Sequence, residues 1–242
     1  MYFSKGNLWY GKAEGVEAET FNFENEQWEF QPASDGAWNE NHVSHFYWSK
    51  DASIACAQKY EDSTASGNDT FFTNAASFFV REAPMVNYFS LSKDEWQYLI
   101  TGRISAEEGE ETARYAKATI VDENTSVTGL ILFPDEFSVP EDVMFPSGIN
   151  TASSSFDTNS YTTAEWKKFE IAGAVFLPAA GARINNKIDN VGLECYYCSS
   201  SPCDNDTGVA HYALYFRQDA VDAMCPNQRN IGCCIRLVTE VE

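Results

Sequence analysis

Two hexapeptides of one design show where this chain begins a helix. LSKDEW and YTTAEW each read apolar residue, Ser or Thr, two further residues, Glu and Trp. This pattern is a capping box, in which the Ser92 or Thr162 side chain caps the helix and the following Glu bonds back to the cap. The two boxes predict short helices over residues 93–102 and 163–171, the second ending near Gly173.

Outside these helices, short runs of alternating apolar and polar residues indicate strands. Region 31–90 is instead rich in Ser, Asn, Asp and Ala with scattered aromatic residues, and we expect long ordered loops there. No Gly-, Ser- or Pro-rich linker divides the chain, so we expect one α+β domain over residues 1–242. The predicted strands are 2–10, 21–30, 116–121, 127–133, 174–178, 194–200, 211–216 and 231–238.

The charge of the chain restricts its partners. The 242 residues include 36 Asp and Glu against 16 Lys and Arg, a formal net charge of −20. Such a surface repels phosphate, which disfavours nucleic acids and anionic membranes as partners. The acidic residues are scattered along the sequence, as expected of a soluble exported or surface protein.

No segment of the sequence has the length and apolarity of a membrane span. A helix needs about 20 apolar residues to cross a bilayer, and no run approaches that length. The first residues, MYFSKGNLWY, alternate like a strand and lack a basic segment followed by an apolar one. We therefore expect no direct membrane insertion, and a chain that begins inside a domain with any export signal outside it.

Cysteines are crowded near the C-terminal end, where the segment CYYCSSSPC begins at Cys195. The chain has seven, an odd number, so complete pairing within it is excluded. The spacing of Cys195 and Cys198 is that of half a zinc site, but no second pair or His partner follows at the usual spacing. In a strand, residues three apart also face opposite sides. We therefore predict no metal site and no cofactor.

Disulfides are a further alternative for an exported domain. Cys233 and Cys234 are adjacent, so in a strand their side chains point to opposite faces and a bond between them would be strained. One or two bridges stay open as an alternative, although the spacing is not that of a disulfide framework.

Motifs of enzyme active sites are missing from the sequence. It has three histidines, His42, His45 and His211, and neither a G-x-S-x-G elbow nor an H-E-x-x-H helix. His42 and His45 fall in the loop-rich part, where we expect exposed and inert histidines. The segment DNDTG (204–208) opens like a calcium loop but lacks the later bidentate Glu. We therefore predict that the protein is not an enzyme and has no catalytic residues.

The segment AHYALYFR (210–217) alternates most clearly. Every second side chain, beginning with Ala210, belongs to a predicted apolar face. The alternate side chains share no chemistry, since they are a base, a methyl group, a phenol and a guanidinium: His211, Ala213, Tyr215 and Arg217. A solvated face tends toward charge and a catalytic face repeats one chemistry, so this face fits neither.

Six segments, in order, resemble the Fibrobacter succinogenes major paralogous domain: YFSKGNLWY, LSKDEWQYLITGR, GLILFPDEF, AGAVFLPAAGAR, YYCSSSP and GCCIRLV. The resemblance covers nearly the whole chain. This family belongs with the C-type-lectin-like fold, in its formylglycine-generating-enzyme-like subtype. The resemblance thus implies an α+β fold with two short helices, small twisted sheets, long ordered loops and a compact sheet that joins the two chain ends.

The C-terminal segment looks like the variable region of a Bacteroidales protein diversified by a retroelement. Such systems replace adenines, typically in Asn codons, and the outcomes include Cys, Tyr, Asp, His, Arg and Ala but exclude Trp, Lys and Glu. No Lys follows Lys187 and no Trp follows Trp166. The resemblance implies a scaffold with inserted loops over residues 1–192 and a variable ligand-binding region over residues 193–238.

The implied ligand-binding residues are those whose side chains such replacement can produce. They are Cys195, Tyr196, Cys198, Cys203, Asp204, Asp206, His211, Ala213, Tyr215, Arg217, Asp219, Ala220, Asp222, Cys225, Pro226, Ile231, Cys233 and Cys234. The cysteines are then sampled side chains rather than reagents. One departure from the family is Cys198, which stands where Trp is usual.

Binding is the implied function, with variable side chains projecting from a platform of fixed residues. We expect affinity to come from Tyr196, His211, Tyr215 and Arg217, because aromatic residues and Arg dominate hot spots. The implied partner is a protein or glycan receptor on another cell surface. The implied location is extracellular or on the cell surface, as a pilus-tip or lipoprotein adhesin, or on a phage tail as a receptor-binding protein. The platform residues are Tyr197, Ser199, Ser200, Tyr212, Leu214, Phe216, Arg229, Gly232, Arg236, Leu237 and Val238.

Two other functions occur on this fold. A formylglycine-generating-like oxidase uses a cysteine pair, but its catalytic motif is not recognisable in this chain. A calcium-dependent glycan-binding lectin carries E-P-N or Q-P-D and W-N-D triplets, which are absent from the sequence. Both stand as alternatives to a binding protein without a cofactor.

Overall fold

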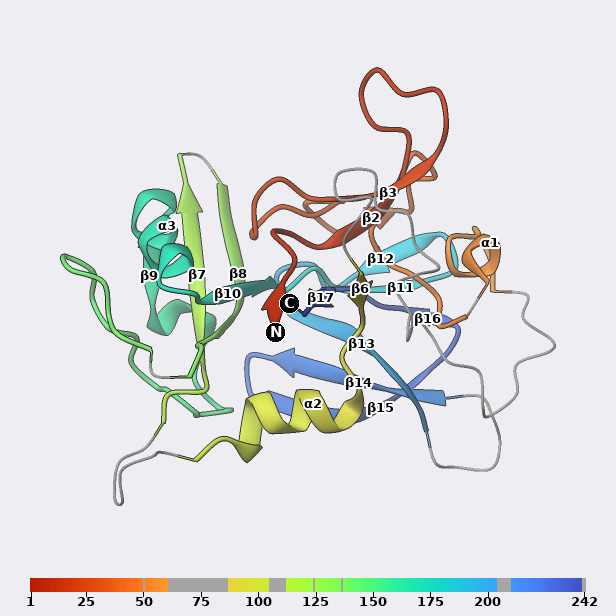
Figure 1. Ribbon diagram of the computed structural model, residues 1–242. Coiled ribbons are helices and arrows are strands. Elements are labelled where there is room, and N and C mark those ends of the chain that lie inside the picture. The colour runs from red at the N-terminus through yellow and green to blue at the C-terminus, as the bar shows by residue number, and fades with distance from the viewer. Residues whose placement is uncertain are drawn as a thin grey trace.

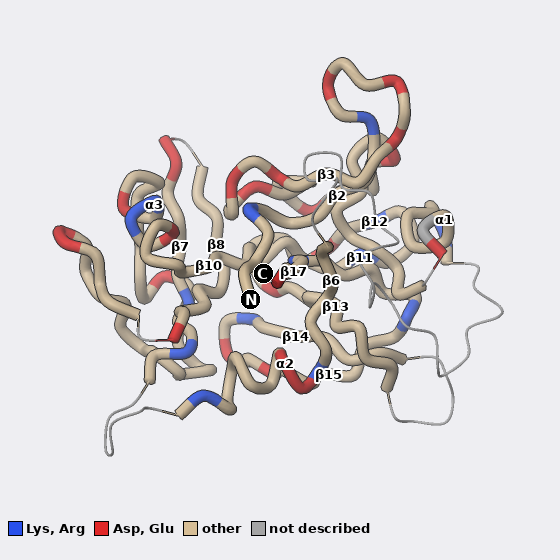
Figure 2. The backbone as a smooth tube through the Cα atoms, in the orientation of Figure 1, with Lys and Arg blue, Asp and Glu red and all other residues tan. Residues whose placement is uncertain are grey.

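The computed structural model describes residues 1–49, 51–60, 87–104, 112–123, 125–135, 137–203 and 210–240 (Figure 1). Within these residues the fold is mixed α+β, with five small sheets and three α-helices, which confirms the predicted class. None of these helices is long and apolar enough to cross a bilayer. Figure 2 shows the acidic residues spread over many elements of the chain.

Both predicted helices are present with their capping boxes. Helix α2 (Lys93–Gln97) continues as the π-helix η2 (Tyr98–Gly102), and α3 (Thr163–Ile171) covers its predicted range. In each box the hydroxyl of Ser92 or Thr162 accepts a hydrogen bond from the backbone N–H three residues on. The Glu carboxylate of that residue accepts in turn from the backbone N–H of the cap. The local sequence therefore accounts for where both helices start.

Helix α3 lies against a four-stranded sheet in the order β10-β8-β7-β9 (Figure 1). Strands β7 and β8 are antiparallel over eight residues each, and β9 runs parallel to β7. Trp166 and Phe169 of α3 are fully buried in the same apolar cluster as residues of this sheet. The strands predicted at 116–121, 127–133 and 174–178 are confirmed. The bounds are β7 (Tyr115–Asp122), β8 (Thr125–Leu132), β9 (Ser160–Thr162) and β10 (Val175–Pro178).

The first and last strands of the described chain belong to one three-stranded sheet. Strand β17 (Val238–Thr239) lies between β1 (Tyr2–Phe3) and β6 (Tyr88–Phe89) and is antiparallel to both. The buried guanidinium of Arg236 donates from Nε to Asn7 Oδ1 at 3.0 Å and to three backbone carbonyls of other segments. The sheet that the resemblance implied between the two chain ends is therefore present.

Two predicted strands are broken where one continuous strand was expected. The first splits into β1 and β2 (Leu8–Gly11), and the last splits into β16 (Ile231–Gly232) and β17. Between β1 and β2, a Cβ atom on Gly6 would lie 2.3 Å from the carbonyl oxygen of Glu24. The chain passes this backbone at a distance that only glycine permits, and hydrophobic alternation carries no signal of that approach.

Two further sheets, β3-β2-β5 and β16-β11-β12-β4, complete the fold. The strand predicted at 21–30 is represented only by the shorter β3. The expected loop region contains short elements as well, and its residues 50 and 61–86 lie outside the described chain. The remaining bounds are β3 (Thr20–Phe23), β4 (Gly36–Ala37), β5 (His42–Val43), α1 (Ala52–Ala55), η3 (Phe156–Thr158), β11 (Ala182–Ile184) and β12 (Lys187–Asp189).

The C-terminal quarter forms an antiparallel sheet in the order β13-β14-β15. Its strands are β13 (Glu194–Pro202), β14 (Ala210–Arg217) and β15 (Ala220–Gln228). The first two were predicted and are confirmed. Strand β15 was missed because its sequence, AVDAMCPNQ, lacks clear alternation and contains Pro226. It lies at the edge of this sheet, where proline is tolerated.

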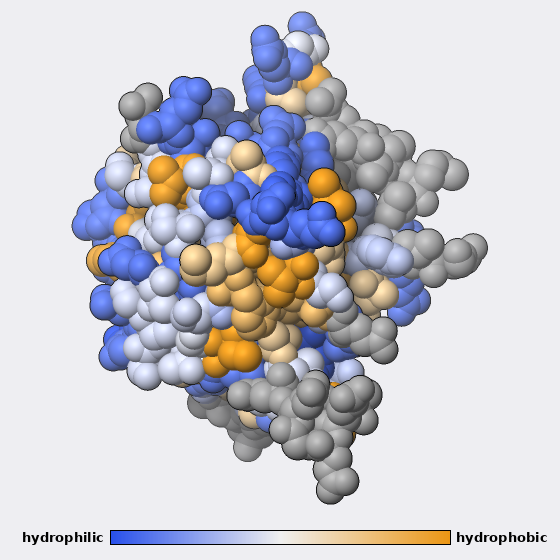
Figure 3. Space-filling model, turned by 90° about the vertical axis from the view of Figure 1, so that its left-hand side faces the viewer, coloured by the Kyte–Doolittle hydropathy of each residue, from blue (hydrophilic) through white to orange (hydrophobic). Residues whose placement is uncertain are grey.

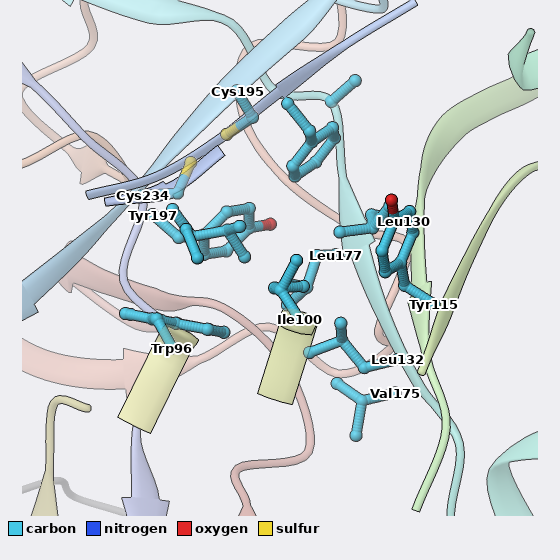
Figure 4. Packing of buried hydrophobic residues seen from close by; sticks show 14 of the residues in the cluster. Trp96, Ile100, Tyr115, Leu130, Leu132, Val175, Leu177, Cys195, Tyr197 and Cys234 are labelled. Atoms are coloured by element: carbon cyan, nitrogen blue, oxygen red, sulfur yellow. The ribbon is translucent and has the colours of Figure 1, made fainter. Parts of the chain in front are cut away.

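One face of this C-terminal sheet rests on the largest apolar cluster of the described chain (Figure 4). Trp96 from α2 and Ile100 from η2 lie below Tyr197 of β13, and all three are at most 2% exposed. Leu130 and Leu177 connect the cluster to the sheet that carries α3. The sheet is thus backed by a packed interior, which holds its strands in a fixed position.

Apolar surface is not confined to the C-terminal sheet. Figure 3 views the molecule from the side that carries α3 and shows apolar side chains gathered between hydrophilic regions. Among the described residues, Met144 and Ile171 are 81% and 87% exposed. Exposed apolar residues alone therefore do not single out a functional surface in this protein.

Candidate functional site

The alternation predicted for β14 places its side chains on two faces of the C-terminal sheet. In the register of β13 and β14, Tyr196 lies opposite Tyr215 and Cys198 opposite Ala213. In the register of β14 and β15, Ala213 lies opposite Cys225, His211 opposite Asn227 and Tyr215 opposite Asp222. We call this side the mixed face; it consists of Tyr196, Cys198, His211, Ala213, Tyr215, Asp222, Cys225 and Asn227.

The two ends of the mixed face differ in exposure. His211 and Ala213 are 0% exposed and Cys198 is 2% exposed, and we call these three residues the closed end. Tyr196 and Tyr215 are half-buried, and Arg217 at the end of β14 is exposed. We call these latter three the open end. The prediction that the whole row of alternate side chains points outward is therefore wrong for His211 and Ala213.

The closed end is covered by two segments from elsewhere in the chain. Phe46 and Cys233 form an antiparallel bridge, with backbone N–H···O distances of 2.8 and 2.9 Å. The ring of Trp48 stacks on His211 with centroids 5.5 Å apart, and its Nε1 donates to the carbonyl of Ser199 at 2.8 Å. This cover buries side chains that alternation alone would leave on an outer face.

Several predicted binding residues are consequently interior side chains. All of them are buried, so their projection toward a partner is a wrong prediction. They are Cys195, Cys198, Cys203, His211, Ala213, Cys233 and Cys234. His211, one of the expected affinity anchors, is among them. Cys203 is the least enclosed, at 8% exposed, and its backbone N–H donates to the carbonyl of Ala210.

The other predicted binding residues lie at the surface or are half-buried. The accessible set is Tyr196, Tyr215, Arg217, Asp219, Ala220, Asp222, Cys225, Pro226 and Ile231. Asp204 and Asp206 lie outside the described residues, together with the rest of the DNDTG segment. The accessible set comes from the open end, the β14–β15 turn, β15 and the start of β16.

The open end carries a stacked tyrosine pair. The rings of Tyr196 and Tyr215 lie 4.5 Å apart at an interplanar angle of 29°. The hydroxyl of Tyr215 donates to Glu194 Oε2 at 2.7 Å. Burial, and then the bond to the Glu194 carboxylate, raise the pKa of Tyr215 to about 12. The pair is therefore held by stacking and by a hydrogen bond while part of each ring stays accessible.

A shallow depression borders the open end. Its lining includes Leu193, Glu194, Arg217 and Asp219, from the start of β13 and the turn between β14 and β15. Arg217 Nε lies 2.6 Å from Asp219 Oδ1, and both side chains are exposed. An exposed ion pair of this kind contributes about 0–1 kcal/mol to stability, so its charges are available to a partner at little cost.

Nearly all the predicted platform residues are buried. Tyr197, Leu214 and Phe216 are 0% exposed in the cluster that holds α2. All other predicted platform residues are buried except Tyr212, which is half-buried beneath the ammonium of Lys93 at 4.7 Å from its ring centre. The division into buried platform and accessible residues therefore holds for this set.

The buried cysteines of β13 lie next to the cysteines that follow β16, and not next to each other. Cys195 and Cys198 face opposite sides of β13, and Cys233 and Cys234 belong to different apolar clusters, as predicted for both pairs. Cys195 and Cys234 meet on the face that carries Tyr197 (Figure 4). Burial, and then the neighbouring Cys195 thiol, hold the pKa of Cys234 well above its ordinary value. Every described cysteine is a free thiol.

On the closed end, Cys198 and Cys233 meet His211. The two Sγ atoms and one imidazole nitrogen all lie within 4.8 Å of one another. Burial raises the pKa of the Cys233 thiol, but the hydrogen bond with Cys198, and then His211, outweigh burial, so this pKa lies below its ordinary value. The pKa of Cys198 is raised instead, by burial and by its Cys233 neighbour.

Sequence reasoning missed this grouping because it looked for ligands at fixed spacing. The three residues come from β13, from β14 and from the segment after β16. The two predicted strands 194–200 and 211–216 held part of the signal, since pairing Cys198 with Ala213 brings His211 into the adjacent row. No sequence pattern, however, places Cys233 against that row.

The N-terminal histidines also differ from expectation. His45 is 0% exposed, and its Nε2 lies 2.9 Å from the carbonyl oxygen of Ala180. Burial lowers the pKa of His45 to about 4, so the side chain is a neutral part of the interior. His42 is half-buried, 2.6 Å from Glu24 Oε1. Neither histidine lies on the mixed face.

Comparisons of the chain with models of protein families, with curated proteins and with solved structures find no match.

Proposed function

We propose that this protein is a surface-displayed binding protein with a C-type-lectin-like fold, and that a retroelement diversifies its C-terminal segment to alter receptor recognition. The observation that carries the proposal is the open end. There, the stacked pair of Tyr196 and Tyr215 and the exposed Arg217 lie on a sheet with a fully packed interior.

This arrangement favours binding for a physical reason. Aromatic residues and Arg supply most of the affinity at protein interfaces, and ordering each flexible side chain costs about 0.5–1.5 kcal/mol. The stacking and the Glu194 hydrogen bond already restrict Tyr215 before a partner arrives. Part of that ordering cost is therefore borne by folding rather than by binding.

Burial also separates the residues that can contact a receptor from those that cannot. We propose that the accessible set defined above is the variable set, and that the buried cysteines, His211 and Ala213 are constant. A random side chain at a buried position would create a cavity or a clash, which costs about 1–5 kcal/mol. A diversification system that altered such positions would lose folded protein rather than gain specificity.

The partner that we propose is a protein or glycan receptor on another cell surface. Asp219 and Asp222 are exposed beside Arg217, and Glu194 lines the neighbouring depression. A receptor patch with donors or positive charge complements these carboxylates, while a nucleic acid would be repelled by a chain of net charge −20. The proposed settings are a pilus-tip or lipoprotein adhesin and a phage tail, and the proposal includes no catalytic step.

The test needs no knowledge of the ligand. The neighbourhood of the gene is sequenced for a reverse transcriptase and a near-copy template repeat, and the gene itself is deep-sequenced in a growing population. We expect substitutions at template adenines in the codons for Tyr196, Tyr215, Arg217 and Asp222. We expect none above background in the codons for Tyr197 and Leu214, which serve as controls within the same strands.

Two results would overturn the proposal. One is a C-terminal segment that varies no more than residues 1–192. The other is variation that falls equally on the buried and accessible codons of β13 and β14.

A further inference from the structure

We propose that Cys198, His211 and Cys233 form a buried Zn²⁺ site that joins β13 and β14 to the segment following β16. The donors converge from three separate segments of the C-terminal quarter, and their ligand atoms lie within 4.8 Å of one another. None of the three side chains is more than 2% exposed. This inference is independent of the binding function proposed above.

The distances suit a common metal ion. Cys233 Sγ lies 3.8 Å from His211 Nε2. With Zn–S of about 2.3 Å and Zn–N of about 2.05 Å, this separation subtends an angle of about 120° at the metal, close to the tetrahedral value. Cys198 Sγ lies within 4.8 Å of both of these atoms and completes the group of three donors.

The imidazole is oriented as a ligand. Its Nδ1 lies 2.9 Å from the carbonyl oxygen of Tyr212. A carbonyl oxygen only accepts, so Nδ1 donates its N–H to Tyr212, and Nε2 is the ring nitrogen that lies toward Cys233 Sγ. A histidine that ligates a metal usually donates its other N–H to such an oxygen, which fixes the tautomer and the ring. Stacking on Trp48 restricts the ring further.

A second polar group supports one of the sulfurs. The side-chain amide of Asn227 donates to Cys233 Sγ at 3.0 Å, and Asn227 is 4% exposed. Donation of an N–H to a thiolate stabilises its negative charge when a metal is bound. Each cysteine loses its thiol proton to solvent when it binds the ion.

The opposite face of the sheet supplies a control. Cys195 and Cys234 are also buried and adjacent, but the described residues around them include no histidine or carboxylate that completes a group of three. Cys195 lies on the same strand as Cys198, and Cys234 follows Cys233 directly. Variants at these two positions change an equivalent thiol without touching the proposed site.

The experiment uses the full chain, purified with a phosphine reductant and stripped of metal. It is titrated with Co²⁺ and then with Zn²⁺. We expect one Co²⁺ per chain, with thiolate-to-cobalt charge-transfer absorption that one equivalent of Zn²⁺ removes. Cys198→Ser and Cys233→Ser should each weaken Zn²⁺ binding at least tenfold, whereas Cys195→Ser and Cys234→Ser should bind as the unaltered protein does.

A second measurement avoids variants that fail to fold. Alkylation of the unaltered protein is mapped by mass spectrometry with and without Zn²⁺, and we expect selective protection of Cys198 and Cys233 over Cys195 and Cys234. The proposal is overturned if no charge-transfer band appears or if all four thiols are protected equally. It is also overturned if the Cys195→Ser variant loses binding as Cys198→Ser does, or if metal-free chain and chain exposed to Zn²⁺ both carry a Cys198–Cys233 disulfide.

Discussion

The open and closed ends of the mixed face share strands, register and alternation, yet one is accessible and the other is interior. His211 and Tyr215 lie four residues apart on the same side of β14. His211 is covered by Trp48 and by the bridge between Phe46 and Cys233, whereas Tyr215 stacks on Tyr196, donates to Glu194 and stays half-buried.

Alternation therefore determines on which face of a sheet a side chain lies, but not whether that side chain is exposed. Exposure depends on whether a distant segment lies over that part of the sheet. In this protein the cover comes from a loop near residue 46 and from the residues that follow β16. Substitutions at matched covered and uncovered positions test this explanation of the difference in exposure.

The largest effect is expected from removing the cover. Trp48 is 0% exposed, so Trp48→Ala leaves a cavity over His211 and should lower the free energy of unfolding by about 3–5 kcal/mol. Trp9 also stacks on a histidine, His42, but both are half-buried, and Trp9→Ala should cost about 1 kcal/mol. Urea unfolding of the two variants measures the contrast. Equal losses would mean that Trp48 does not seal the closed end.

The next effect concerns a small residue that diversification was expected to vary. Ala213 is 0% exposed between Cys198 and Cys225, so Ala213→Tyr should overpack the interior and cost about 1–3 kcal/mol. Ala220, half-buried at the start of β15, gives the matched variant Ala220→Tyr, which should change stability by less than about 0.5 kcal/mol. Thermal unfolding of the two variants measures the difference. If Ala213→Tyr is as stable as Ala220→Tyr, the prediction is contradicted and position 213 belongs to the variable set.

A smaller effect is expected from the tyrosine pair itself. Tyr196→Ala, Tyr215→Ala and the double variant form a cycle whose coupling energy should be about 0.5–1.5 kcal/mol, because the rings stack at 4.5 Å. Each single variant should keep a cooperative unfolding transition in urea. A coupling energy near zero would show that the two rings act independently in solution.

The smallest effect is a pH dependence at the open end. The pKa of Tyr215, raised to about 12, exceeds its ordinary value of 10.0, so the unfolded chain loses this proton first as pH rises. Stability should therefore fall between pH 10 and 12 by more in the unaltered protein than in Tyr215→Phe. Because solvent reaches the half-buried phenol, screening should keep the difference below about 1 kcal/mol. Unfolding free energies of both proteins at pH 9 and pH 11 test the sign, and an equal or larger fall in the Phe variant would contradict it.

The elements that the sequence predicted well are those fixed by neighbouring residues. The capping boxes at Ser92 and Thr162 determine two helix starts through hydrogen bonds between residues that are three positions apart in the sequence. The alternation in β14 determines which side chains share a face. Strand β15 was missed because its stability depends on pairing with β14 rather than on its own pattern.

The candidate site was predictable only in part, for the same reason. The accessibility of Tyr215 and Arg217 follows from their place near the end of a strand. The burial of Cys198 and His211 depends on Phe46, Trp48 and Cys233, whose approach leaves no periodic signal in the sequence. Side chains that such long-range contacts bring together are recognised in the folded structure and not from their spacing in the sequence.

The order of strands in the small sheet β1-β17-β6 has a consequence for how the protein is made. Its middle strand follows both outer strands in the chain, so during synthesis β1 and β6 lack this partner until Val238 and Thr239 emerge. This sheet therefore forms only after β17 is made, and a chain truncated before Val238 should be more prone to aggregate than a chain that includes β17.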